Sequence, residues 1–267
     1  MAARGEILAA YDALNPVAFG ELATRAGGTV SEHDGVLLAR GPEPAGIIVN
    51  GAFRRDRRTP AARVLELARD HFADGFGFTL WAPVHSDADI DAAAMAAGWR
   101  MIVELPVMAV ASPVTGPPPA KGVVVRAVDP GSGSDMKAFA HIAGTTLGDD
   151  EDERDAYRRA LRSAGLYRDG CRGVIAAVDG EDAAVAWALV HGPTALVGWV
   201  GTLDRFRRRG LGELVTRDVT NWAFANGATL VTLQASPMGR PIYDRMGYET
   251  VSAERLFVPQ ADVSSDR

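Results

Sequence analysis

A proline-rich segment divides this chain and limits how the rest of it can fold. Residues Ser112 to Pro119 read SPVTGPPP. Prolines lack the main-chain N–H and fix φ, so this segment cannot enter the interior of a helix or a sheet. We expect a semi-rigid linker over residues 112–121. It separates residues 1–111 from residues 122–267, and each part is long enough for a core of its own.

The composition indicates a folded protein without an electrostatic preference for nucleic acids. Of the 267 residues, 47% are hydrophobic and 23% are charged, close to average globular usage, which favours a packed core. The formal net charge is -6. Non-specific binding to nucleic acid depends on neutralising phosphates, so an acidic chain has no electrostatic reason for it.

The cysteine content and the first residues bear on the cellular compartment. Cys171 is the one cysteine, so no disulfide can form within the chain, which suits a reducing compartment. Residues 1–10 lack the long apolar run of a signal peptide. No stretch approaches the roughly 18 apolar residues of a spanning helix. The sequence therefore predicts a cytoplasmic location and no membrane partner.

The second part of the chain alternates strand-like and helix-like segments. Its most regular helix pattern runs over 211–226, where Leu211, Val215, Val219 and Trp222 form one apolar stripe. The full predicted order is strand 123–127, helices 134–146 and 150–164, strands 173–178, 183–191 and 195–203, helix 211–226, strand 229–234, helix 240–246 and strand 249–258. This order predicts an α/β fold with a mixed sheet.

The first part of the chain repeats much of this order. The predicted elements are strands 35–40 and 46–50, a helix from Pro60, strand 78–82, helix 87–97 and strand 99–110. Pro60 suits the first turn of a helix, where a missing N–H costs nothing. We interpret the first part as a second, diverged copy of the same unit. An unrelated α/β module is the alternative.

One short segment has the form of an anion-binding turn. It reads Arg207-Arg208-Arg209-Gly210-Leu211-Gly212 and lies between a predicted strand and the best predicted helix. Main-chain amides at a helix start lack intrahelical partners, and the helix dipole favours negative charge there. Glycines let phosphates approach the backbone closely. Alone, the segment also fits a basic surface turn, and it matches neither G-x-G-x-x-G nor a phosphate-loop Gly-Lys-Ser/Thr ending.

A second segment follows one helix and one strand later. It includes Ser236, Tyr243 and Gly247-Tyr248, and Tyr243 lies 33 residues after Gly210. Together the two segments resemble the core of the GNAT N-acetyltransferase superfamily over residues 197–251. The family's R/Q-x-x-G-x-G/A signature matches Arg207, Gly210 and Gly212. The resemblance implies two acyl-CoA N-acyltransferase domains of GNAT type in tandem, the first of them degenerate.

The resemblance also implies roles for particular residues in binding acetyl-CoA, with no metal. The amides of Arg208 to Gly212 would hold the CoA pyrophosphate, and the preceding strand would bind the pantetheine arm. The implied cofactor-binding residues are Gly201, Thr202, Leu203, Arg207, Arg208, Arg209, Gly210, Leu211, Gly212 and Ser236. Ser236 departs from the family's common Asn, and Asp204 stands where proline is common. Tyr243 would protonate the departing thiolate, since an unperturbed tyrosine is protonated at neutral pH.

The general base is not identified by this pattern. Family members often place Glu or His on the strand before the turn, and residues 195–201 contain neither. His191 is the nearest candidate, although its position fits a surface histidine at a hairpin end better. Glu254 and Asp204 are weaker candidates, and water-mediated deprotonation is another route.

These features predict an N-acetyltransferase that transfers acetyl from acetyl-CoA to a primary amine in a ternary complex. The amine would belong to a small molecule or a peptide, and a homodimer is left open. The alternative is a catalytically silent CoA-binding regulatory protein. The corresponding turn of the first part, Phe53 to Pro60, has arginines but no glycine, and Ala94 stands where the acid tyrosine would be. We therefore expect one CoA site per chain.

Overall fold

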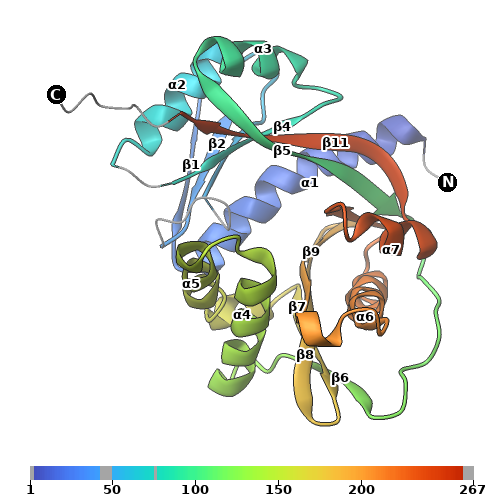
Figure 1. Ribbon diagram of the computed structural model, residues 1–267. Helices are drawn as coiled ribbons and strands as arrows, with labels where there is room; N and C mark the ends of the chain where they lie inside the picture. Colours follow the sequence, from blue (N-terminus) through green and yellow to red (C-terminus); the bar gives the residue numbers. More distant parts are fainter. Residues whose placement is uncertain (1–2, 43–49, 75–76, 261–267) are drawn as a thin grey trace.

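The computed structural model describes residues 3–42, 50–74 and 77–260. Within them the strands form one sheet in the order β1-β2-β3-β4-β11-β5-β10-β9-β8-β7-β6 (Figure 1). The strands are β1 (Thr29–His33), β2 (Val36–Arg40), β3 (Gly51–Arg54), β4 (Thr79–Pro83), β5 (Trp99–Val110), β6 (Val123–Ala127), β7 (Cys171–Val178), β8 (Glu181–His191), β9 (Thr194–Thr202), β10 (Leu230–Gln234) and β11 (Glu249–Pro259).

Helices cover both faces of this sheet. They are α1 (Arg4–Arg25), α2 (Ala61–His71), α3 (Ala88–Ala96), α4 (Gly133–Leu147), α5 (Glu151–Ala160), α6 (Leu211–Ala225) and α7 (Arg240–Arg245), with short 3-10 turns η1 (Ala164–Tyr167) and η2 (Asp204–Phe206). In the second half, α4 and α6 lie on opposite faces of β7 to β9 (Figure 1). No helix in the described part of the chain is long and apolar enough to cross a membrane.

The predicted α/β class with a mixed sheet is confirmed. Most neighbouring strands are antiparallel, whereas β3–β4 and β9–β10 are parallel. Each parallel pair is joined through a helix, α2 or α6, because parallel strands need a long crossover connection. The element order of the second half matches the predicted one, except that the predicted helix 150–164 ends at Ala160 as α5 and that two short 3-10 turns, η1 and η2, were not predicted.

The first half differs more from the prediction. The expected strand 46–50 lies almost wholly outside the described residues, and β3 begins just after it at Gly51. Helix α1 and strand β1 were not predicted. In α1, Leu14, Ala18 and Leu22 join the large core of the second half, whereas Phe19 packs with β2 to β4 of the first half. One helix therefore holds the two halves together.

The last strands of the two halves are exchanged in the sheet. Strand β11 lies between β4 and β5 of the first half, and β5 lies between β11 and β10 (Figure 1). The β5–β11 pairing runs from Ala109↔Glu249 to Trp99↔Pro259. The two halves therefore share a continuous sheet, although the proline-rich segment separates them along the chain.

The proline-rich segment is held against α6. The Asn221 side chain accepts from the Val114 N–H at 2.8 Å and donates to the Val114 carbonyl at 2.9 Å. Arg217 donates to the Pro117 carbonyl at 2.6 Å. The path of the segment is thus fixed by the helix whose first turn is the predicted anion site.

Candidate functional site

Strands β9 and β10 separate shortly after they meet. They are paired only where Thr194 to Leu196 lies beside Leu230 to Thr232. Beyond this point β10 continues to pair with β5, and β9 continues to pair with β8. Trp199 has a φ of 50°, beside a register shift in the β8–β9 pairing, which is how a bulge redirects a strand. The edge of β9 that follows Leu196 is therefore open to an extended ligand.

The turn after β9 presents main-chain amides at the start of α6. Arg208 and Gly210 both have positive φ, 61° and 74°, and α6 begins at Leu211. Among the described residues, no acceptor receives a hydrogen bond from the main-chain N–H groups of Arg208 to Gly212. Amides arranged in this way at a helix start attract an anion.

The side chains of this turn add positive charge. Arg208 and Arg209 are exposed, and neither forms an ion pair within the described residues. Arg209 stacks over the Phe206 ring at 5.5 Å. Arg207 instead donates to the Thr202 carbonyl at 3.2 Å and pairs with Asp204 at 2.8 Å, so it holds the end of β9 against the turn.

Tyr243 approaches the same region from α7. It is 7% exposed, and its ring lies so close to Gly239 that a Cβ there would be 2.8 Å from the ring. Burial raises the pKa of Tyr243 to about 12, and a hydrogen bond with Thr216 of α6 acts in the opposite direction. The phenol therefore stays protonated at neutral pH and can donate a proton.

The remaining predicted cofactor-binding residues flank this turn. A side chain at Gly201 would collide with Thr146 of α4, so the close packing of α4 on β9 requires glycine there. Leu211 is 2% exposed and anchors the first turn of α6 in the core. Ser236 is exposed, and its Oγ accepts from the Gly239 N–H at 3.1 Å, which fixes the turn into α7.

His191 is not brought to this region, which corrects its expected role as the base. It ends β8 and pairs with Thr194 at the start of β9, whereas the anion turn follows the far end of β9 at Thr202. An extended strand of that length spans about 25 Å. His191 Nδ1 lies 2.9 Å from Glu21 of α1, and its side chain is half exposed. Of the weaker candidates, Asp204 lies beside the turn and pairs with Arg207.

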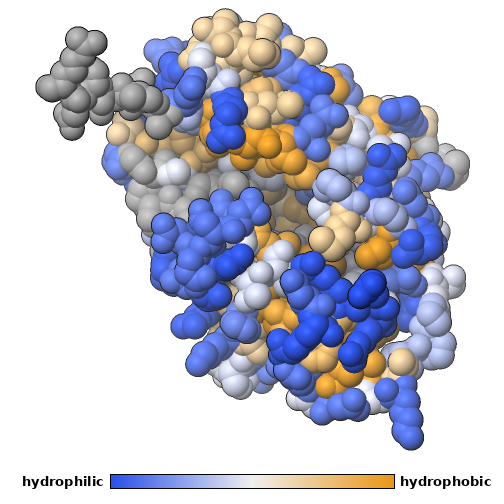
Figure 2. Space-filling model, viewed as in Figure 1, coloured by the Kyte–Doolittle hydropathy of each residue, from blue (hydrophilic) through white to orange (hydrophobic). Residues whose placement is uncertain are grey.

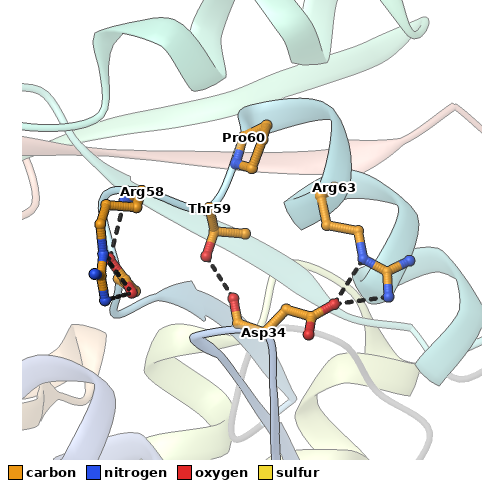
Figure 3. A pocket seen from close by; sticks show the side chains of 6 residues that line it. Asp34, Arg58, Thr59, Pro60 and Arg63 are labelled. Atoms are coloured by element: carbon orange, nitrogen blue, oxygen red, sulfur yellow. Dashed lines mark hydrogen bonds and ion pairs between the residues drawn. The ribbon is translucent and has the colours of Figure 1, made fainter.

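The corresponding turn of the first half is neutralised by carboxylates. It lines a shallow pocket of about 490 Å³ at the start of α2. Figure 3 shows Arg63 reaching Asp34, at 2.8 Å, and Thr59 donating to the Asp34 carbonyl. Arg58 pairs with Asp56 at 2.7 Å. An anion would meet carboxylates here, unlike at Arg208 and Arg209.

Comparison with known proteins agrees with this geometry. Residues 135–239, which include the anion turn and β10, match the acetyltransferase (GNAT) domain family. Over these residues the chain is similar to that family, and the second half that contains them is called the GNAT domain below. No curated protein matches the chain.

Solved structures resemble the chain over most of its length, beyond the GNAT domain itself. A GCN5-related N-acetyltransferase from Kribbella flavida is 22% identical, with a TM-score of 0.71, over 92% of this chain and 95% of that one. One from Sphaerobacter thermophilus is 14% identical, with a TM-score of 0.57, over 91% and 92%. A tandem GNAT protein from the clavulanic acid biosynthesis pathway is 19% identical, with a TM-score of 0.52, over 84% and 77%. At these identities the likeness shows the fold alone.

The molecular surface is hollowed on the face that the space-filling view presents (Figure 2). Figure 2 shows a depression between α4 and α7, where apolar side chains reach the surface amid hydrophilic ones.

A buried polar cluster next to the GNAT domain had no signal in the local sequence. The Tyr11 hydroxyl of α1 donates to Glu254 Oε2 at 2.5 Å. Gln234, the last residue of β10, donates to the Tyr11 oxygen at 2.7 Å and to Asn15 Oδ1 at 3.1 Å. Glu254 is fully buried, and burial raises its pKa to about 8. Its helical partners come from the unpredicted α1, so sequence reasoning missed the cluster and had only Glu254 as a weak candidate.

Proposed function

We propose that this protein is an N-acetyltransferase that transfers an acetyl group from acetyl-CoA to a primary amine. The observation that carries the proposal is the turn from Arg208 to Gly212, whose amides have no acceptor among the described residues. A pyrophosphate is the anion that such a turn at a helix start accommodates best. Arg208 and Arg209 would add charge-assisted hydrogen bonds to phosphate oxygens.

The pantetheine arm would follow the open edge of β9. Main-chain groups of Gly201 to Leu203 lie between this edge and the turn, and an extended amide chain can hydrogen-bond to an unpaired strand edge. The arm would then lead the thioester into the gap between β9 and β10, toward Tyr243. Ser236 would contact the cofactor from the end of β10.

The proposed reaction is direct attack within a ternary complex. The amine nitrogen forms a bond to the thioester carbonyl carbon, and the C–S bond breaks with its electron pair going to sulfur. Tyr243 gives its proton to that sulfur and regains one from solvent. The attacking nitrogen loses one proton to water, and β9 itself carries no ionisable side chain. A positioned acid of this kind contributes about 10²-fold or more to a rate.

The first half would serve as a degenerate copy that binds no CoA. The strand exchange supports this interpretation, because β4 and β10 occupy symmetric positions around the β11–β5 pair. In the first half, Arg54 is buried at the end of β3 and pairs with Asp87 at 2.5 Å. A buried ion pair therefore stands at the end of the first half's parallel strand pair.

Thiol release from acetyl-CoA tests the proposal. We would measure it with n-butylamine, tyramine, spermidine and lysine, each against acetyl-CoA alone. Release that depends on an amine, with the N-acetyl product seen by mass spectrometry, is the expected result. Tight CoA binding without release for any amine would contradict the proposal and favour the silent CoA-binding protein.

A further inference from the structure

The last residue of β10 is held by a chain of hydrogen bonds beneath α1. Gln234 Nε2 lies 2.7 Å from the Tyr11 oxygen and 3.1 Å from Asn15 Oδ1. Tyr11 in turn lies 2.5 Å from Glu254 Oε2. Tyr11, Asn15 and Glu254 are each at most 2% exposed, whereas Gln234 is only half-buried. Three buried side chains therefore fix a fourth that water can reach.

The hydrogen bonds in this series are all donated in one direction, from Gln234 to Tyr11 and from Tyr11 to Glu254. Burial, with the nearby Glu254, raises the pKa of Tyr11 well above its usual value, so the phenol keeps its proton. Glu254 Oε2 accepts a hydrogen bond from the Tyr11 hydroxyl. It can do so when the carboxyl is ionised, and also when the carboxyl is protonated on Oε1. The Tyr11 oxygen is then an acceptor, and so is Asn15 Oδ1. Both accept from the –NH₂ group of Gln234, because its amide oxygen could not donate to either of them.

This arrangement determines which atom Gln234 presents to its surroundings. With both amide protons used, the remaining polar atom is Oε1, for which no partner exists among the described residues. Gln234 lies two residues beyond Thr232, where the pairing of β9 with β10 ends. A fixed hydrogen-bond acceptor therefore lies at the edge of the gap that the thioester would enter. Tyr243 reaches this region from α7 instead, packed against α6.

We infer that Gln234 Oε1 accepts a hydrogen bond from the attacking amine and positions it, and that Tyr11 and Glu254 act by orienting Gln234. The inference rests on the proposed acetyl transfer and specifies its acceptor. A primary amine can give one N–H to Oε1 while a second N–H remains to be lost after attack. A secondary amine has one N–H for both purposes. The site should therefore prefer primary amines, and Gln234 should be the source of that preference.

The test compares Gln234→Met with the unchanged protein. Methionine keeps the length of the side chain and removes both amide groups. We would use the panel amine with the highest kcat/KM, together with its N-methyl derivative, and measure CoA affinity by calorimetry. The expected result is a fall of about tenfold in kcat/KM for the primary amine, the usual worth of one such hydrogen bond at its upper end. The ratio of primary to secondary amine should fall with it, and CoA affinity should stay within twofold.

Tyr11→Phe tests the positioning role with a matched control. Tyr248→Phe also removes a buried tyrosine hydroxyl, one that lies 2.7 Å from Thr220 Oγ1, but on the side of α6. We expect Tyr11→Phe to lower the primary-to-secondary ratio and Tyr248→Phe to leave it unchanged. Equal changes in the two variants would overturn the role of Tyr11.

The outcomes separate this inference from the proposed function. If Gln234→Met keeps both the primary-amine kcat/KM and the amine preference within twofold, the inference fails while acetyl transfer stands. If the unchanged protein binds CoA but none of the amines causes thiol release, acetyl transfer fails and the inference fails with it.

Discussion

Arg54 Nη2 lies 2.5 Å from Asp87 Oδ1, and both side chains are almost completely buried at the end of the first half's parallel strand pair. Arg54 also reaches Asp89 at 2.5 Å. In the second half, Arg208 stands at the corresponding turn, exposed and without an ion pair in the described part of the chain. The first half's arginine is therefore neutralised by buried carboxylates, whereas the second half's arginine keeps its charge available to an anion.

This contrast predicts one CoA site per chain and a structural role for Arg54. Arg54→Ala should leave the buried carboxylate of Asp87 without its main partner, at a cost of about 3–5 kcal/mol. The expected result is a lower melting temperature with a calorimetric stoichiometry still near one. Arg55→Ala, which removes an exposed arginine paired with Glu32, serves as the control and should change neither. Two equivalent CoA sites in the unchanged protein would refute the division between the halves.

A second prediction concerns Gly210→Asp. The new carboxylate would stand beside the unpaired amides and repel a pyrophosphate. CoA affinity should fall more than tenfold, or about 1.4 kcal/mol, with the fold retained. The matched control is Gly180→Asp, because Gly180 also has a positive φ, 87°, and open space around it, but lies in the β7–β8 hairpin. Equal affinity in both variants would reduce the turn to a simple helix start.

A third prediction concerns Tyr243→Phe. This change removes one proton donor and little volume, so CoA affinity should be nearly unchanged while turnover falls by roughly 10²-fold. The loss should appear in kcat, since the hydroxyl matters as charge develops on sulfur. Because the pKa of Tyr243 is raised to about 12, the activity of the unchanged protein should show no loss from tyrosine ionisation up to about pH 10. Full turnover in the phenylalanine variant would leave Tyr243 as a packing residue.

A fourth prediction concerns pH and Glu254. Burial raises the pKa of this carboxyl from 4.5 to about 8, with Asp12 and Asp87 adding to the rise and Arg57 opposing it. Between these two values the folded state holds a proton that the unfolded state has released. The free energy of unfolding should therefore fall as the pH rises through this window, by an amount on the order of a few kcal/mol.

Urea unfolding at several pH values measures this effect. Glu254→Gln should remove most of the decline between about pH 4.5 and pH 8. Glu249→Gln changes an exposed carboxylate at the start of the same strand and should leave the decline in place. A decline of the same size in Glu254→Gln would show that other groups cause it.

Local features of the site could be predicted from the sequence, because each depends on neighbouring residues. The turn from Arg207 to Gly212 follows from glycine spacing beside an amphipathic helix, and the structure places its amides without protein acceptors. Helix α1 could also have been found, since Tyr11, Leu14, Ala18 and Leu22 recur at helical spacing. Pro16 lies within this helix and weakens the pattern.

The relationships between distant residues could not be predicted in this way. Gln234 and Tyr11 are 223 positions apart, and Tyr11 and Glu254 are 243 apart. Period and spacing determine which face of a strand is buried, but not which strand lies beside it. The position of β11 next to β4 is decided by packing over the whole sheet. The hydrogen bonds around Gln234 depend on that packing and on α1.

The exchange of β5 and β11 constrains the order in which the chain can complete its structure. Strand β4 pairs with β3 on one side, and on the other side with residues 254–257 of β11, which come after all the other strands of the sheet. During synthesis, the first half must therefore wait with one edge of its sheet unpaired until residues 254–257 have emerged from the ribosome. The GNAT domain in turn depends on β5 of the first half, because β5 pairs with both β10 and β11. We therefore expect that neither half folds as a separate unit.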